Sequence, residues 1–377
     1  MITLEHTSDW HVIRYCQSRN HENWGKPLTL DEYYKREEIS YKHELCNLDR
    51  DYSKEKKGDY YWVLKDTDID TSSKTGADPK LKNIVSACEI LVRDSWYLDT
   101  ENPDSEPSDC LSAVIGSVYT FSEHRSKGYA SRMLQLLVEK MQDILGNPHD
   151  FSFLYSEVGE FYSNFGFKSY HVPVCIIPMK SIKELPAIDY VPLTTHFESQ
   201  VELYGKKMKQ LMLKEAKSGE KSVVVCLKPQ QQILEWFLNR SRHTGRSLEG
   251  LTEEAANKLV YGAELSTGDF IIWLLDFTEK TAVVLMIYAT TSQNVKELIK
   301  ACKQLIPDGF EKIIIWQDEL TDYSKTGASD LSILTFIEEE LQGESGVKNS
   351  SLSALRMLHL DEDVAVKWVG NGKWSWF

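Results

Sequence analysis

The sequence predicts a mixed α/β (α+β) protein built from two domains. Its 377 residues are more than one ordinary hydrophobic core holds and are enough for two domains of roughly 150–200 residues each. Strand-like and helix-like segments alternate in both halves of the chain. Around residues 111–159 the order strand, helix, strand forms a crossover unit, and such a unit joins two parallel strands.

The first half of the chain predicts a sheet flanked by helices. Residues 1–60 have a polar, helical pattern, in which Thr29 and Glu32 show the spacing of a helix capping box. Helices are also predicted within 123–141 and over 160–167. Segments rich in β-branched and aromatic residues predict strands over 59–66, 83–98, 111–121, 151–159 and 170–179.

The alternation restarts in the second half, after a connector with a charged helix. A helix at 229–242 is followed by two apolar strands (DFIIWLLDF and TAVVLMIYAT), a helix (SQNVKELIKACKQL) and a strand (FEKIIIWQD). The closing segment VAVKWVGNGKWSWF predicts a strand hairpin with a Gly-Asn-Gly turn. We therefore expect a first domain at 1–185, a connector at 186–222 and a second domain at 223–377.

Composition and charge disfavour several classes of function. The formal net charge of −14 argues against nucleic-acid binding, which usually needs a basic face. No apolar run reaches the ~20 residues of a membrane helix, and the N-terminus lacks an export signal, so we expect a cytoplasmic protein without a membrane partner. Seven scattered cysteines without C-x-x-C, and the lack of H-E-x-x-H and G-x-S-x-G, predict no disulfide framework, no metal and no serine hydrolase elbow.

The segment EHRSKGYASRMLQLLVEKM (123–141) predicts a binding site for a diphosphate. It places a short turn before an apolar-periodic helix, and a helix N-terminus binds anions through its unpaired N–H groups and its dipole. Gly128 permits a tight turn and close approach of a ligand, Arg125 and Lys127 add positive charge, and Ala130 is small. The alternative is that Gly128 merely ends a loop and the two cations are solvated surface.

Together with FYSNFGF (161–167), this segment resembles the GCN5-related N-acetyltransferase (GNAT) superfamily. The residues that match the superfamily motifs R-x-x-G-x-A and F-Y-x-x-x-G-F are Arg125, Gly128, Ala130, Phe161, Tyr162, Gly166 and Phe167. The resemblance implies a mostly antiparallel sheet with a V-shaped splay between two parallel strands, flanked by helices. It also implies acetyl-CoA as the co-substrate.

Four segments resemble the fungal lysine N6-acetyltransferases of lysine catabolism: ACEILVR (87–93), SVYTFSEHRSKGYASRML (117–134), FLYSEVGEFYSNFGF (153–167) and NGKWSWF (371–377). That family implies a second, GNAT-like domain, and free L-lysine, acetylated on its side-chain amine, as the acceptor. The second domain has no cofactor motif of its own, and we expect it to cap the acceptor site. The chain departs from the family at Glu157, where Asp is common, at Phe167, where Trp is common, and at the terminal Phe377.

The resemblance implies which residues bind the cofactor. Val118, Tyr119 and Thr120 would pair with pantetheine like an added strand, and a backbone N–H near Val118 or Tyr119 would polarise the thioester carbonyl. The residues expected at the diphosphate are Arg125, Ser126, Lys127, Gly128, Tyr129, Ala130 and Ser131.

Three side chains are candidates for the transfer chemistry. Tyr162 would act as general acid toward the departing thiolate, unless it only packs on the sheet. A lysine amine is almost wholly protonated at neutral pH, so a base must take its proton, and Glu157 is the candidate for that base or for anchoring the amine. Glu89, in an apolar run, is a candidate for binding the substrate ammonium, unless it faces solvent or pairs elsewhere.

Two other functions remain open at this point. The acceptor would then be a polyamine, ornithine or a protein lysine, or the chain would be a non-catalytic regulator that only binds acetyl-CoA. A protein acceptor needs an open groove, which a capping second domain opposes. The presence of both Tyr162 and Glu157 argues against a non-catalytic regulator.

Overall fold

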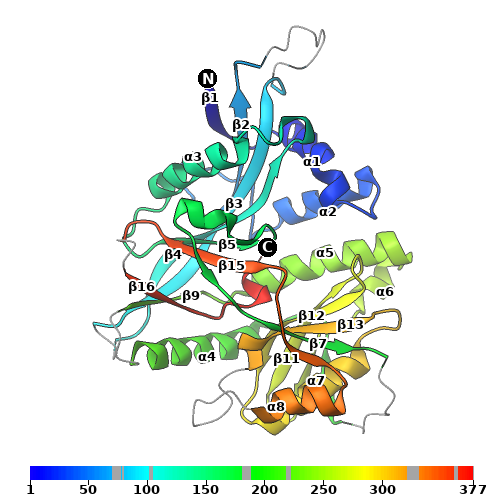
Figure 1. Cartoon of the computed structure of the whole chain (residues 1–377). Coiled ribbons are helices and arrows are strands. Elements are labelled where there is room, and N and C mark those ends of the chain that lie inside the picture. The colour runs from blue at the N-terminus through cyan, green and yellow to red at the C-terminus, as the bar shows by residue number, and fades with distance from the viewer. Residues whose placement is uncertain are drawn as a thin grey trace.

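Two mixed sheets with helices on their faces form the protein (Figure 1). The computed structural model describes residues 1–69, 78, 80–101, 105–180, 188–217, 222–320, 331–360 and 364–376. Within these ranges there is one sheet of nine strands and one of seven. The expected mixed α/β architecture, with a second sheet region related to the first, is confirmed.

The nine-stranded sheet contains the predicted crossover unit. Its strand order is β1-β2-β3-β4-β5-β15-β6, with β9 paired to both β3 and β16. Its strands are β1 (Ile2–Thr7), β2 (Gly58–Asp66), β3 (Ile84–Asp99), β4 (Ser108–Thr120), β5 (Phe151–Ser156), β6 (Lys168–Tyr170), β9 (Ser222–Leu227), β15 (Leu352–Met357) and β16 (Ala365–Val369).

The seven-stranded sheet has the order β14-β7-β13-β12-β11-β10-β8. Its strands are β7 (Val174–Pro178), β8 (Tyr190–Leu193), β10 (Gly262–Leu265), β11 (Phe270–Asp276), β12 (Thr281–Tyr288), β13 (Lys312–Trp316) and β14 (Glu344–Val347). The α-helices of the described residues are α1 (Trp10–Trp24), α2 (Leu30–Lys42), α3 (Tyr129–Ile144), α4 (Glu198–Ala216), α5 (Gln231–Glu249), α6 (Glu253–Asn257), α7 (Ser292–Leu305) and α8 (Leu331–Thr335). Shorter helical turns include η2 (Gly159–Phe165), η3 (Gln317–Leu320) and η5 (Lys373–Ser375).

Alternating side chains of β2 explain why helices cover both faces of the first sheet. Tyr60 and Trp62 pack in one core cluster with the apolar stripe of α3, whereas Tyr61 and Val63 point to the other face, where α1 packs. Figure 1 shows α3 on one side of this sheet and α1 with α2 on the other. The helix α5 lies beside α2, at the seam between the two halves.

The helix α2 begins where the sequence predicted. The Thr29 hydroxyl accepts the Glu32 N–H at 3.3 Å, and the Glu32 carboxylate accepts the Thr29 N–H at 2.9 Å. This reciprocal pair is the capping box, and it satisfies two backbone donors at the start of the helix.

The two parallel strands of the crossover unit part from each other. Residues Ser112–Ile115 of β4 pair with Phe151–Leu154 of β5, and no further pair joins the two strands although β4 continues to Thr120. The V-shaped splay implied by the sequence resemblance is therefore present. It leaves the last residues of β4 with a free edge on the β5 side.

A β-bulge in β4 lies at this opening. Glu89 of β3 is paired with Gly116, whereas Ala87 is paired with Tyr119, so Ser117 and Val118 together face a single residue of β3. Ser117 has a φ of 51°, a left-handed conformation that is uncommon outside glycine. A bulge leaves one residue unpaired and turns the strand, so the backbone near Val118 is directed out of the regular ladder.

The chain passes between the two sheets more often than the sequence predicted. The strand β7, expected in the first domain, pairs with β13 in the second sheet. Three later strands, β9, β15 and β16, complete the first sheet instead. The expected boundary near residue 185 lies outside the described residues, and the division into 1–185 and 223–377 stays a prediction.

The predicted C-terminal hairpin was wrong. The strand β16 pairs in parallel with β9, and the chain after Gly370 forms the single turn η5 instead of a returning strand. The local Gly-Asn-Gly pattern favoured a hairpin turn. In the structure Trp374 is fully buried and packs on Tyr204, so the segment runs into the core instead of returning along β16. Ser375 is also tied down, because Arg93 of the first sheet donates to its carbonyl.

Three statements about the described residues bear on function. No helix is both long and apolar enough to cross a membrane. No cluster of three or more His, Cys, Asp or Glu side chains is placed to hold a metal ion. All seven cysteines are buried and unpaired.

Candidate active site

A cavity of about 540 Å³ lies where the splay of the first sheet meets the second half of the chain. Four of the predicted site residues line it: Glu89, Val118, Glu157 and Tyr162. The second half contributes side chains from α5, the β11–β12 turn and η5, namely Trp236, Phe237, Arg240, Ser241, Thr244, Asp276, Thr278, Glu279, Lys373 and Trp376. Two segments far apart in sequence thus enclose one space.

The remaining predicted residues lie beyond this cavity, along β4 and the start of α3. Gly128 is the N-cap of α3, with a φ of 80° and no side-chain cap. Residues 125–128 are exposed, and a Cβ placed on Gly128 would meet no atom within 4 Å. The N-terminus of α3 is therefore open to a ligand and is not sealed beneath other side chains.

The cations at this junction are held by backbone carbonyls. Arg125 donates from Nε to the Thr120 carbonyl at 3.2 Å, and Lys127 lies 3.4 Å from the Glu123 carbonyl. Both contacts involve neutral acceptors, and no ion pair with a described carboxylate compensates either positive charge. An anionic group with two phosphates fits this combination of open N–H groups and positive charge.

Glu89 is the carboxylate placed deepest in the cavity. It is 5% exposed, accepts a hydrogen bond from the Tyr41 hydroxyl at 2.6 Å and a second from the Ser117 hydroxyl. Burial disfavours its charged form and raises the pKa of Glu89 to about 7, although the hydrogen bonds from Ser117 and Tyr41 act in the opposite direction. Such a carboxyl group exchanges its proton near neutral pH.

A second carboxyl group lies behind Glu89. Asp59 on β2 is two residues along the ladder from Glu89 and is fully buried. Neither of its carboxyl oxygens meets the full geometry of a hydrogen bond with a described residue, although the Tyr60 N–H and the charge of Arg50 favour its charged form. Burial raises the pKa of Asp59 well above its ordinary value, and the charge of Glu89 raises it further. Two adjacent carboxyl groups resist ionising together, so Asp59 is neutral when Glu89 is charged.

Tyr162 and Glu157 occupy different environments in the same cavity. Tyr162, on η2, is 9% exposed, and burial raises the pKa of its hydroxyl well above the usual range, which keeps it a proton donor. Glu157 follows the last residue of β5 and is exposed. The predicted strand over 151–159 thus ends three residues early, and Glu157 stands on the turn beyond it.

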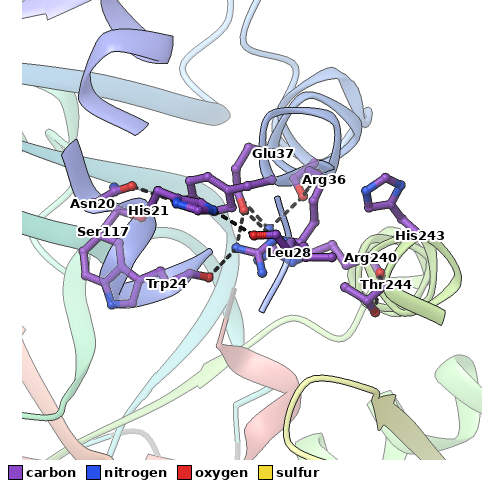
Figure 2. A network of polar contacts seen from close by, with 12 residues as sticks. Asn20, His21, Trp24, Leu28, Arg36, Glu37, Ser117, Arg240, His243 and Thr244 are labelled. Carbon is purple, nitrogen blue, oxygen red and sulfur yellow. Dashed lines mark hydrogen bonds and ion pairs between the residues drawn. The ribbon is translucent and has the colours of Figure 1, made fainter. Parts of the chain in front are cut away.

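A polar network at the seam was not predicted from the sequence (Figure 2). Glu37 on α2 binds two arginines: Arg36 at 2.6 Å through one oxygen and Arg240 of α5 at 3.2 Å through the other. Arg36 also donates to the Trp24 carbonyl at 3.1 Å. Glu37 and Arg240 are 203 positions apart in the chain, so no local pattern could have paired them.

Lys373 is a further cavity residue that the sequence did not single out. Its ammonium lies 3.2 Å from the centroid of the Trp376 ring. Desolvation lowers the pKa of Lys373 to about 7, although the carboxylates of Asp276 and Glu157 favour its charged form. The only sequence signal for this residue was its place in the closing NGKWSWF segment.

The second sheet also has two parallel strands that part from each other, and a buried side chain of the protein occupies the opening between them. The parallel strands β12 and β13 pair only over Thr281–Val283 and Lys312–Ile314. Beyond that point the Glu319 carboxylate accepts the Ile287 N–H at 3.1 Å and the Tyr204 hydroxyl at 2.6 Å. A backbone donor at the opening of this sheet is therefore already used by a buried side chain.

The helix after β12 also differs from α3. The N-terminus of α7 is capped by Thr291, whose hydroxyl accepts the Asn294 N–H at 3.2 Å. A side-chain cap takes one of the donors that a phosphate would need. The second half therefore repeats the fold of the first without its open helix end.

A splayed mixed sheet with an uncapped, glycine-started helix after the splayed strand defines an N-acetyltransferase of the GNAT type. Residues 108–170 match the family described as acetyltransferase (GNAT) domain. Residues 180–377, more than half of the chain, match the family described as LYC1 GNAT-like C-terminal domain. The chain belongs to this family within the GNAT superfamily, and it is an acetyl-transferring enzyme.

Relatives of similar length support this assignment. The chain is 28% identical over 414 residues to an uncharacterized protein of Saccharomyces cerevisiae, covering 100% of this chain and 98% of the relative. It is 24% identical over 421 residues to a lysine acetyltransferase of Yarrowia lipolytica, covering 97% of each. A probable N-acyltransferase of Enterococcus faecalis shares the fold, with a TM-score of 0.54, 11% identity, and coverage of 96% of this chain and 74% of that one.

The raised pKa of Glu89 predicts a stability gain for Glu89→Gln. Between the ordinary carboxyl pKa and about 7, the unfolded chain ionises while folded Glu89 stays protonated, so the native protein loses stability as pH rises through that window. Glutamine does not ionise. Its amide oxygen can accept one of the two hydrogen bonds from Tyr41 and Ser117, and its NH2 group can donate to the other hydroxyl. We expect denaturant unfolding at pH 8 to show Glu89→Gln more stable than the native protein by roughly 1–3 kcal/mol, with a smaller gap at pH 5.

The exposed Glu157→Gln variant is the matched control, and its unfolding curve should follow that of the native protein at both pH values. A stability gap for Glu89→Gln that stays the same from pH 5 to pH 8 would show that burial does not shift this carboxyl group.

The contrast between α3 and α7 predicts one coenzyme A site per chain, which titration calorimetry measures directly. Gly128→Ala should weaken coenzyme A binding roughly tenfold, because alanine disfavours the left-handed conformation that shapes the start of α3. Gly268→Ala is the control, since Gly268 has a φ of 82° and equally open surroundings but lies in the second half. Two sites per chain, or equal losses in both variants, would contradict this assignment.

Proposed function

We propose that the protein transfers the acetyl group of acetyl-CoA to the side-chain amine of a free amino acid, L-lysine, by direct attack in a ternary complex. The observation that carries this proposal is the single cavity in which a buried carboxyl group, a tyrosine hydroxyl and the bulged backbone of β4 converge. The similarity to a lysine acetyltransferase over the whole chain supports lysine as the acceptor.

Acetyl-CoA fits the surface next to this cavity. The open N-terminus of α3 and the exposed residues 125–128 would hold its diphosphate, and the free edge of β4 near Tyr119 and Thr120 would pair with the amides of pantetheine. When bound, acetyl-CoA supplies an activated acetyl group as a thioester. Binding of acetyl-CoA by these residues stays a prediction, and the open helix end and the free strand edge are consistent with it.

Glu89 is the side chain best suited to take the proton of the acceptor amine. With a pKa of about 7, it is largely ionised at slightly alkaline pH and holds a proton more strongly than an ordinary carboxylate does. Its hydrogen bonds with Tyr41 and Ser117 fix its position. Glu157, exposed at the cavity, then serves to attract the ammonium form of the acceptor.

Tyr162 and Val118 would act on the coenzyme side of the reaction. The hydroxyl of Tyr162 is protonated at neutral pH and can give its proton to a developing thiolate. The backbone N–H near Val118, turned out of the ladder by the bulge, can stabilise negative charge on the carbonyl oxygen. Tyr162 would thus neutralise the thiolate, and the N–H near Val118 would stabilise the charge on the carbonyl oxygen.

The acceptor is tested by measuring thiol release from acetyl-CoA with lysine, ornithine, spermidine or a histone-tail peptide. We expect turnover with lysine and none with the peptide, because the second half of the chain walls the cavity. Turnover with the peptide or spermidine but not with lysine would contradict the proposal. Silence with every amine would favour a non-catalytic coenzyme-binding protein.

The role of Tyr162 is tested by Tyr162→Phe. We expect kcat to fall roughly 100-fold, while the Kd for coenzyme A stays within about twofold, since only the proton donor is removed. Tyr170→Phe is a matched control, because Tyr170 bonds the Val366 carbonyl and does not line the cavity. If kcat and coenzyme affinity fall together in Tyr162→Phe, this tyrosine is a packing residue and not the general acid.

A further inference from the structure

The seam between α2 and α5 carries a surplus positive charge. Two guanidinium groups, of Arg36 and Arg240, share the single carboxylate of Glu37. Arg36 and Glu37 are each 8% exposed. A cation removed from water is costly unless an anion compensates it, and here one anion serves two cations. Arg240 also favours the charged form of Glu89, but the ion pair that it makes among the described residues is with Glu37, so an incoming anion could bind it directly.

Of the two arginines, Arg240 has more guanidinium nitrogens without a hydrogen bond among the described residues. Arg36 donates from Nε to Glu37, and its Nη2 contacts both Glu37 and the Trp24 carbonyl. Among the residues that the structure describes, Arg240 makes its hydrogen bonds through Nη1, to Glu37 at 3.2 Å and to the Ser40 hydroxyl at 2.8 Å. Its side chain is 25% exposed and lines the cavity.

Arg240 is also held in place. Its guanidinium carbon lies 4.7 Å from the centroid of the Trp236 ring, one turn earlier on α5. The bond from Nη1 to Ser40 fixes the group against α2. A planar guanidinium restrained in this way is preorganised for a carboxylate, which it can bind through two parallel hydrogen bonds.

The lysine of the cavity has carboxylates of its own nearby. Lys373 packs on Trp376, and the carboxylates of Asp276 and Glu157 face it. Glu89 experiences the charges of both Glu37 and Arg240, so the proposed base and the arginine face the same space. The cavity thus has a place for an amine near Glu89 and a place for an anion at Arg240.

We infer that Arg240 binds the carboxylate of the acceptor and thereby restricts the acceptors to amino acids that carry a side-chain amine. The inference rests on the proposed function and names the residue responsible for its selectivity. A diamine or polyamine would instead bring an ammonium group beside a guanidinium that has only a shared counter-ion, which costs binding energy.

The test compares lysine with 1,5-diaminopentane, which is lysine without its carboxylate. We expect the native enzyme to favour lysine in kcat/KM by roughly 10- to 100-fold, the range that a hydrogen bond between charged groups supports. In Arg240→Gln, kcat/KM for lysine should fall to the level of the diamine, while that for the diamine should stay the same or rise. The exposed Arg246→Gln, on the same helix and outside the cavity, should keep the native ratio.

Activity on the diamine reports whether the variant is folded. If Arg240→Gln loses turnover with both substrates, Arg240→Lys decides, because it keeps the charge and loses the paired hydrogen bonds. Selective loss with lysine in that variant supports the inference, and equal loss with both substrates overturns it. An unchanged ratio in Arg240→Gln overturns the inference and leaves the proposed function standing, whereas a native enzyme that does not acetylate lysine overturns the proposed function and the inference with it.

Discussion

The parting of β4 from β5 after Ile115 is the constraint on which the rest of the site depends. A strand in the middle of a sheet has both edges occupied, but β4 beyond this point has one edge free for a ligand. The bulge at Ser117 and Val118 lies in the same stretch and turns the backbone toward the space that opens. The helix α3 then starts from the end of that strand, so one short segment supplies edge, bulge and helix N-terminus together.

The second half of the chain adds walls to this opening, so that residues of both halves line one cavity. It is attached to the first sheet by strand exchange, since β9, β15 and β16 pair there, and by the buried contact of Arg93 with the Ser375 carbonyl. Because strands and the C-terminal turn interlock in this way, the walls from α5 and η5 are held in fixed positions against the splay. In the second half, Glu319 and Thr291 occupy the backbone donors at the splay and at the start of α7, and this half contributes a wall to the cavity.

Local sequence patterns predicted the parts of the site that are local. The capping box at Thr29 and the open helix end at Gly128 depend on residues a few positions apart, and the crossover unit follows from the order of neighbouring elements. Two kinds of feature were missed, because they join distant segments: the strands that cross between the sheets, and the pair of Glu37 with Arg240. The C-terminal hairpin failed for the same reason, since β9 offered a partner that the turn pattern could not reveal.

The buried carboxyl and guanidinium groups at and behind this cavity favour chemistry, but they reduce the stability of the folded protein. The carboxyl group of Asp59 is poorly satisfied among the described residues, Glu89 is buried near it, and two arginines of the seam share one carboxylate. Each arrangement is costly in a folded protein, because a buried polar group needs a partner and a buried charge needs a counter-charge. An acceptor that carries an amine for Glu89 and a carboxylate for Arg240 would relieve the imbalance at both sites at once. On the proposal above, such an imbalance, present without substrate and relieved with it, would let a cavity of about 540 Å³ select its acceptor through charge.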